Sequence, residues 1–170
     1  MTDAGDSAPE ERRRLGWERL SQLGHSLPEP LAAKGGYVAA RAFGGALWVA
    51  GHTGRGPEGP RLTGVVGDDV TLEQAQEEAR RAAVNLLAAV DGCPSLTAGL
   101  GSVEALLHVR VFVAATTEFD RHPLVADAAS QLLHDVLGPA AGTHARTAVG
   151  VSSLPGGSAV ELEAVLAYAG

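Results

Sequence analysis

The last quarter of the chain constrains the fold most, because two runs there alternate between two faces. Residues 144–151 read His-Ala-Arg-Thr-Ala-Val-Gly-Val, and residues 158–165 read Ser-Ala-Val-Glu-Leu-Glu-Ala-Val, with Pro-Gly-Gly between them. Such alternation is typical of β-strands, and proline and glycine mark the turn between strands. We therefore predict a terminal hairpin whose core faces are Val149 and Val151 on one strand and alternate residues of 160–164 on the other.

Arg146 and Glu161 fall opposite each other if the predicted hairpin is symmetric about its centre. Two interpretations are then open. The pair, with His144 and Ala148 on the same face, lines a pocket for a small anion. Alternatively, it is a cross-strand ion pair at the surface, which contributes only ~0.2–1 kcal/mol. The spacing by itself favours the ion pair.

Three segments have helical signals. Thr71 and Gln74 form a capping-box pattern at the start of a helix that ends near residue 91. A second helix begins at residues 120–123, with proline in its first turn, and stops at the Gly-Pro of residues 138–139. The N-terminal helix, over residues 7–23, has a narrow apolar stripe, which predicts an added element packed along one side.

Strand signals lie between these helices, with strands expected over residues 37–43, 47–51 and 106–114 and a short strand over residues 62–66. The element order predicts an α+β fold, a mixed β-sheet with two helices packed on one face plus an extra N-terminal helix. We divide the chain into an N-terminal extension, residues 1–24, and a main domain, residues 25–170. The second face of the sheet needs a cover, which favours self-association.

The composition of the chain argues against some classes of binding partner. The formal net charge of −7 argues against nucleic acid, because phosphate binding needs clustered cations. No apolar run approaches the ~20 residues of a membrane span, and the acidic N-terminus is not a secretory signal. Cys93 is the single cysteine, so no internal disulfide is possible. We expect a cytoplasmic protein with no membrane partner.

Known catalytic motifs are absent from the sequence. The six histidines are scattered without metal-ligand spacing, so we expect no metal site. The glycine-rich residues 51–56 lack the Lys-Ser/Thr of a phosphate-binding loop, and there is no nucleophile elbow. Polar or aromatic side chains that could meet across one sheet remain. These candidates are Tyr37, His52, Asp127, His144, Arg146 and Glu161. Each of them can also be interpreted as an ordinary packing or surface residue.

Several blocks together match a known pattern. The most specific is Ala-Arg-Thr-Ala-Val at residues 145–149, a Leu-Pro turn, and Val-Glu-Leu-Glu-Ala at residues 160–164. Supporting blocks are Gly-Tyr-Val at 36–38, Val-Ala-Gly-His at 49–52 and Val-Arg-Val-Phe-Val at 109–113. With these residues the chain resembles the Rid family, also called YjgF and formerly endoribonuclease L-PSP, over about residues 20–168. The N-terminal helix resembles that of a longer, less characterised branch.

The resemblance implies a chorismate-mutase-like fold and a homotrimer with pockets in clefts between subunits. Deaminating members of the family hydrolyse reactive 2-imino acids to 2-keto acids and ammonia without a cofactor. By resemblance, Arg146 binds the carboxylate of the substrate through its planar fork, and Glu161 orients or activates water. Tyr37 forms a wall of the pocket and is a possible hydrogen-bond donor.

Three positions depart from the deaminating members. Ala148 stands where Cys or Ser is common, Ala50 where Ser precedes glycine, and Asp127 where an Asn is expected. His52 and His144 are candidates to replace the missing polar groups. Two functions follow: an imine deaminase with catalytic Arg146 and Glu161, or a non-catalytic trimeric protein that binds a small carboxylate. The substrate-binding set comprises Tyr37, His52, Asp127, His144, Arg146 and Ala148. The acidic charge and few aromatic residues argue against a third function, ribonuclease activity.

Overall fold

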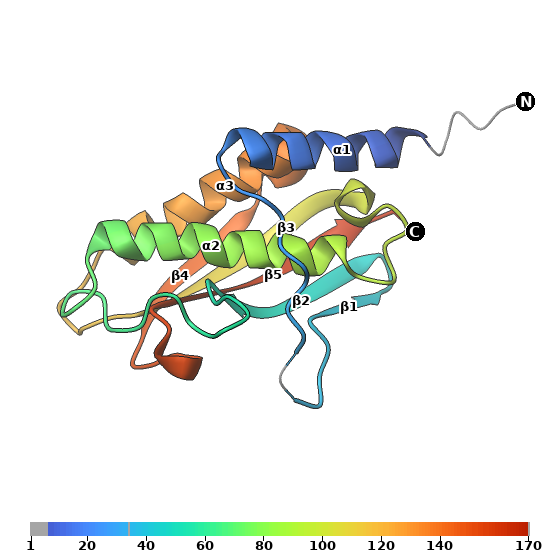
Figure 1. Ribbon diagram of the computed structural model, residues 1–170. Coiled ribbons are helices and arrows are strands. Elements are labelled where there is room, and N and C mark those ends of the chain that lie inside the picture. The colour runs from blue at the N-terminus through green and yellow to red at the C-terminus, as the bar shows by residue number, and fades with distance from the viewer. Residues whose placement is uncertain (1–6, 34, 170) are drawn as a thin grey trace, which may run out of the picture.

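The computed structural model describes residues 7–33 and 35–169 of the chain (Figure 1). Residues 1–6 of the predicted N-terminal extension and the Ser7 side chain lie outside this description. The helices are α1 (Ser7–Gln22), α2 (Leu72–Asp91) and α3 (His122–Gly142), with short 3₁₀ turns η1 (Gly99–Ser102) and η2 (Pro155–Gly157). The strands are β1 (Ala40–Phe43), β2 (Ala46–Thr53), β3 (Val103–Ala114), β4 (Ala145–Val151) and β5 (Val160–Tyr168). None of the described helices is long and apolar enough to cross a membrane.

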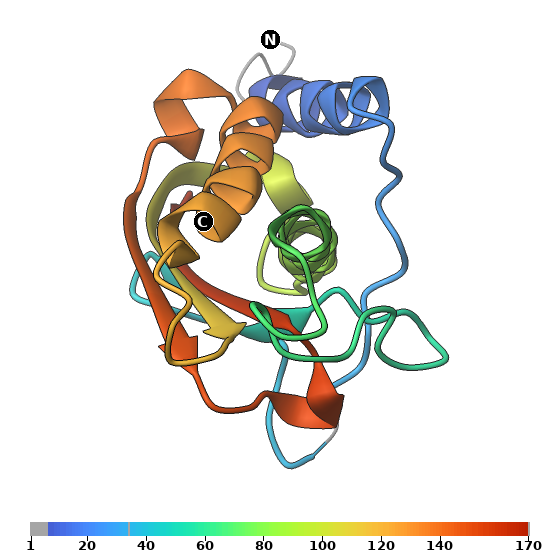
Figure 2. The ribbon, with the colours of Figure 1, turned by 90° about the vertical axis from the view of Figure 1, so that its left-hand side faces the viewer.

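One five-stranded sheet in the order β1-β2-β5-β3-β4 forms the framework, and β3–β4 is its parallel pair. α2 and α3 lie side by side on one face of this sheet (Figure 2). The predicted α+β fold, a mixed sheet with two helices on one face and an extra N-terminal helix, is confirmed. The capping box of Thr71 and Gln74 at the start of α2 is also confirmed, with bonds of 2.8 and 3.2 Å.

The predicted terminal hairpin is wrong. β4 and β5 do not pair with each other, because β3 lies between them, parallel to β4 and antiparallel to β5. Alternation along a strand identifies its two faces but carries no information about which strand is its neighbour. The segment between the last two strands therefore crosses β3 instead of making a tight turn.

The predicted core face is correct for β5 and wrong for β4. On β5, Val160, Leu162 and Ala164 are buried, as expected. On β4, Arg146 reaches side chains of α3, whereas Val149 is 39% exposed on the face away from the helices. Edge strand β4 is covered by α3 mainly through polar and small side chains, so its apolar residues are not a guide to its buried face.

α1 packs against η1 and α3 (Figure 1). The Arg12 guanidinium donates two hydrogen bonds, of 2.9 and 2.7 Å, to the carbonyl oxygen of Gly101. Leu20 joins the core with 1% exposure. The N-terminal helix therefore adds a layer outside α3 and leaves the opposite face of the sheet uncovered.

Candidate functional site

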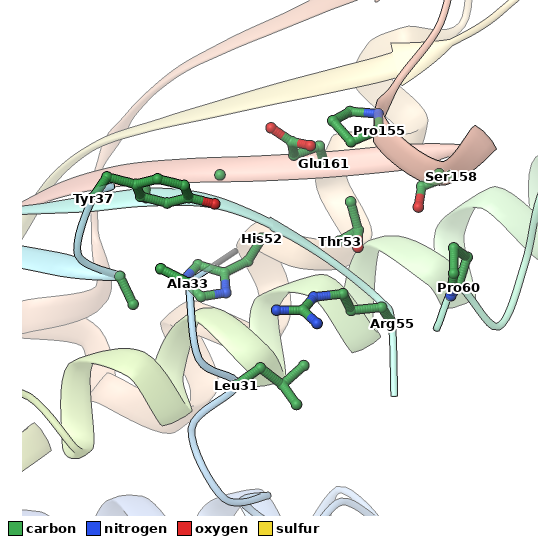
Figure 3. Close-up of a pocket in the computed structure, with 14 residues that line it drawn as sticks. Leu31, Ala33, Tyr37, His52, Thr53, Arg55, Pro60, Pro155, Ser158 and Glu161 are labelled. Atoms are coloured by element: carbon green, nitrogen blue, oxygen red, sulfur yellow. The ribbon is translucent and has the colours of Figure 1, made fainter. Parts of the chain in front are cut away.

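A cavity of about 470 Å³ opens where the ends of β2 and β5 meet the connector before β1 (Figure 3). Tyr37 lies in a bend of that connector, since β1 begins only at Ala40 and not at residue 37 as predicted. Glu161, His52 and Tyr37, three residues singled out from the sequence, all line this cavity. Its remaining lining residues are Leu31, Ala33, Ala39, Ala50, Gly51, Thr53, Arg55, Pro60, Pro155, Gly156 and Ser158.

Glu161 is placed by an irregularity of β2. The register between β2 and β5 shifts between Val49 and His52, and Gly51 lies at that shift beneath the Glu161 side chain. A Cβ atom on residue 51 would overlap the Glu161 carboxylate, so this close approach requires glycine. Burial, and secondarily the charge of Glu163, raise the pKa of Glu161. The result is a half-buried carboxyl group that holds its proton to higher pH than a free one.

His52 lies deeper in the same cavity and is 8% exposed. Its Nε2 atom has no hydrogen-bond partner within the described residues. Burial, and secondarily the charge of Arg55, lower the pKa of His52 to about 4. The imidazole is therefore neutral at neutral pH and acts as a hydrogen-bonding group, not a cation.

Sequence analysis missed three residues that complete this site: Asn85, Arg55 and Ser158. Asn85 of α2 donates through Nδ2 to the carbonyl oxygens of Thr53 (2.7 Å) and Arg55 (2.9 Å), which fixes the turn after β2. Arg55 and Ser158 then line the cavity. The only sequence signal was an arginine between two glycines directly after a predicted strand.

Arg146 lies in another part of the molecule. Its Nη1 donates to Asp127 Oδ1 (2.8 Å) and to Ser130 Oγ (3.1 Å), both on α3. Ser130 Oγ is 3.0 Å from Nε2 of His144, and Nδ1 of His144 lies 2.7 Å from the Gly142 carbonyl oxygen. Because that carbonyl can only accept, His144 carries its proton on Nδ1, and Nε2 accepts from Ser130. The chain of bonds orients the Arg146 guanidinium.

The Arg146 set and the Glu161 cavity do not meet in this chain. Arg146 lies opposite Val109 of β3, whereas Glu161 lies opposite Phe112, three residues further along. The two side chains also point to opposite faces of the sheet. The predicted opposition of Arg146 and Glu161 on adjacent strands is therefore wrong, because β3 separates their strands.

The other predicted residues divide between these two places. Asp127 and His144 accompany Arg146, and Ala148 is half-buried against the core on the same strand. Ala50 borders the cavity beside Gly51. Across residues 7–33 and 35–169, no three His, Cys, Asp or Glu side chains are grouped so that they could hold a metal ion.

Comparison with known families agrees with this architecture. The family model described as endoribonuclease L-PSP matches residues 28–168, which is most of the chain. The chain belongs to this family, the YjgF/Rid family. The Trypanosoma cruzi protein TCP17 is 33% identical over 147 residues, covering 86% of this chain and 90% of that protein. This YjgF/Rid protein therefore has a curated relative along nearly its whole length.

Solved structures extend the comparison beyond the family domain. The Agrobacterium tumefaciens protein Atu1372, described as of unknown function, is 34% identical with a TM-score of 0.84, covering 94% of this chain and 95% of that one. A Shewanella oneidensis MR-1 protein is 24% identical with a TM-score of 0.82, covering 89% and 98%. The Atu1372 match is longer than residues 28–168, so it includes part of the N-terminal extension of this YjgF/Rid protein.

Proposed function

We propose that this protein is a hydrolytic deaminase of small reactive 2-imino acids, which it converts to 2-keto acids and ammonia. Glu161 carries the proposal, because a half-buried carboxyl group with a raised pKa faces a cavity beside the neutral His52 and the phenol of Tyr37. A general base is most effective when its pKa approaches the working pH. No cofactor is needed for this reaction.

The chemistry assigned to Glu161 is a proton relay. Its carboxylate accepts a proton from water while the water oxygen bonds to the imine carbon and the C=N π bond breaks. The carboxyl group passes that proton to the nitrogen, which gives the neutral carbinolamine. The carboxylate then accepts the hydroxyl proton as the C=O bond forms, and delivers it to the nitrogen as the C–N bond breaks and ammonia leaves. The protein gains no net proton, and the substrate exchanges NH for O.

The substrate carboxylate needs a cation, and in this proposal Arg146 of the partner subunit supplies it. The protein is then a homotrimer with a small-molecule carboxylate ligand in each of its inter-subunit clefts. The uncovered sheet face supports self-association, because Phe43 (73% exposed), Trp48 (48%) and Val149 (39%) all project from it. Exposed large apolar side chains gathered on one face mark protein interfaces. We also retain the expectations of a cytoplasmic protein without a nucleic-acid or membrane partner.

A second function, binding of a small carboxylate without turnover, has support of its own. Asp127 occupies the Arg146 guanidinium at 2.8 Å, and its charge opposes a carboxylate ligand there. Ala50 and Ala148 add no polar groups to either place. In this alternative the trimer holds a metabolite in its clefts, and Glu161 has no catalytic role.

The deciding experiment generates 2-iminopropanoate in situ with an amino-acid oxidase and traps it with semicarbazide. Wild-type protein should lower semicarbazone formation, and Arg146→Ala and Glu161→Gln should not. Arg80→Ala, which removes a cation from the surface of α2, is the matched control and should behave as wild type. If wild type and Arg146→Ala are indistinguishable, the deaminase proposal is wrong for that substrate.

Light scattering tests the assembly. The expected mass is that of three chains. A monomer would contradict both functions, since the proposed deaminase takes Arg146 and Glu161 from different subunits and the binding alternative also holds its ligand in clefts between subunits.

A further inference from the structure

We propose that Ser130 is a positioning residue for Arg146, and that it leaves one edge of the guanidinium, Nε and Nη2, for the ligand. Through that edge Arg146 binds a planar carboxylate with two parallel hydrogen bonds. The inference rests on the proposed function, because that function makes Arg146 the partner of the ligand carboxylate.

The Nη1 atom of Arg146 is engaged within the chain. It donates to Asp127 Oδ1 at 2.8 Å and to Ser130 Oγ at 3.1 Å. Each terminal nitrogen of a guanidinium carries two hydrogens, so these two bonds account for both hydrogens of Nη1. Asp127 and Ser130 are three residues apart on α3, which places their side chains on one face of that helix. The two bonds therefore hold one corner of the guanidinium against α3.

The other edge of the guanidinium is open to a ligand. Across residues 7–33 and 35–169, Nε and Nη2 of Arg146 have no hydrogen-bond partner. Neither atom belongs to the buried, unpaired polar atoms of these residues, so both are accessible from outside. Arg146 and Ser130 line an open hollow of about 650 Å³ beside α3. Because the N–H bonds of Nε and Nη2 are parallel, this edge matches the two oxygens of a carboxylate.

His144 fixes the direction of the Ser130 hydroxyl. In the neutral ring Nδ1 donates to the Gly142 carbonyl oxygen at 2.7 Å, so Nε2, which is 3.0 Å from Ser130 Oγ, can only accept. The single hydrogen of the hydroxyl is then used by Nε2, and the lone pairs of Oγ remain for Arg146. Without the ring the hydroxyl could turn away, since a serine in a helix also bonds the carbonyl oxygen four residues back.

Ser130 and Asp127 have different effects on a bound anion. Both hold Nη1 of Arg146, but Asp127 brings a negative charge that opposes the ligand, whereas the Ser130 hydroxyl is neutral. Loss of the hydroxyl should therefore weaken carboxylate binding, and loss of the Asp127 charge should strengthen it. An ordinary surface ion pair between Arg146 and Asp127 gives no reason for an effect of Ser130 on ligand affinity.

Calorimetric titration of the intact protein with 2-oxobutanoate tests the inference. Ser130→Ala should weaken binding roughly threefold to tenfold, since the hydrogen bond that orients Arg146 is lost. Alanine is the better helix former, which offsets part of that loss in the free energy of unfolding, so the variant should remain folded. Thr117→Ala removes an exposed hydroxyl that donates to Glu118 before α3, and this control should bind as wild type. An unchanged affinity in Ser130→Ala would overturn the inference.

Two further measurements report on the hydroxyl and on the free edge. Ser130→Thr keeps the hydroxyl and should retain more affinity than Ser130→Ala, and equal losses in the two variants would contradict a role of the hydroxyl. In nuclear magnetic resonance spectra, saturating 2-oxobutanoate should shift the Nε–H signal of Arg146. An unshifted signal would overturn the assignment of this edge to the ligand.

The same spectra test the direction of the Ser130 hydroxyl. At about pH 8, where an unperturbed imidazole is neutral, His144 should carry its proton on Nδ1. A ring protonated on Nε2 would overturn the relay, because Ser130 would then accept from His144 instead of donating to it.

Failure of this inference and failure of the proposed function give different results. Weaker binding in Ser130→Ala, without any effect of the wild-type protein on semicarbazone formation, keeps the positioning role and refutes the deaminase. If the protein deaminates 2-iminopropanoate, Ser130→Ala should raise KM and leave kcat unchanged. Turnover with an unchanged KM keeps the deaminase and refutes the positioning role.

Discussion

If Arg146 binds a carboxylate as proposed, Asp127 competes with that ligand, and Asp127→Asn should release the competition. Asp127 Oδ1 accepts from the guanidinium at 2.8 Å. The change removes the negative charge and keeps the size of the side chain. The amide can still accept one hydrogen bond from Arg146, and it offers a donor to a bound carboxylate.

The size of the expected effect of Asp127→Asn follows from the exposure of the Arg146 and Asp127 side chains. The Asp127 side chain is 58% exposed and that of Arg146 is 23% exposed, so water screens their attraction. Pairs of this kind contribute ~0.2–1 kcal/mol to stability. The free energy of unfolding should therefore fall by less than ~1 kcal/mol in Asp127→Asn. The same energy no longer opposes ligand binding, so a monocarboxylate should bind up to about fivefold more tightly.

Calorimetric titration with 2-oxobutanoate measures the change. Asp135→Asn is the matched control, because it removes the same charge from α3 at a residue that bonds Gln131 and not Arg146. The reasoning fails if Asp127→Asn binds no more tightly than Asp135→Asn. A weaker affinity would mean that Asp127 positions Arg146 for the ligand instead of competing with it.

Three further changes test the cavity and its support. Gly51→Ala should abolish semicarbazide-detected activity while the far-ultraviolet circular dichroism stays unchanged, because a Cβ would displace the Glu161 carboxylate. Asn85→Leu should lower the free energy of unfolding by ~1–3 kcal/mol in urea titrations, since it leaves the buried Thr53 carbonyl oxygen and the partly buried Arg55 carbonyl oxygen without their donor. Glu78→Gln should stabilise the protein at pH 7 and change little at pH 4. Burial raises the pKa of Glu78, so the cost of its charge is absent below its ordinary value of 4.5 and appears as the pH rises through the folded-state pKa. Equal effects of Glu78→Gln at both pH values would contradict this account.

Local patterns predicted the elements of this fold better than their arrangement. The capping box at Thr71 and the buried face of β5 follow from residues that are neighbours in the sequence. The insertion of β3 between β4 and β5 depends on which strands meet in space, and no periodicity encodes that choice. Arg146 was therefore identified as a candidate but placed opposite the wrong residue.

The residues of the cavity also divide into those that the sequence identified and those that it did not. Tyr37, His52 and Glu161 were identified by residue type and by resemblance, and the structure brings them together. Arg55 and Ser158 were missed, because an arginine in a glycine-rich loop and a serine before a strand are ordinary in sequence.

The position of β3 between the strands of Arg146 and Glu161 also has a consequence for genetics. If each site takes its arginine and its glutamate from different subunits, two inactive alleles can complement each other. Random co-assembly of Arg146→Ala and Glu161→Gln chains would rebuild about a quarter of the sites in a symmetric trimer. A cell carrying both alleles would then regain activity that neither allele provides alone.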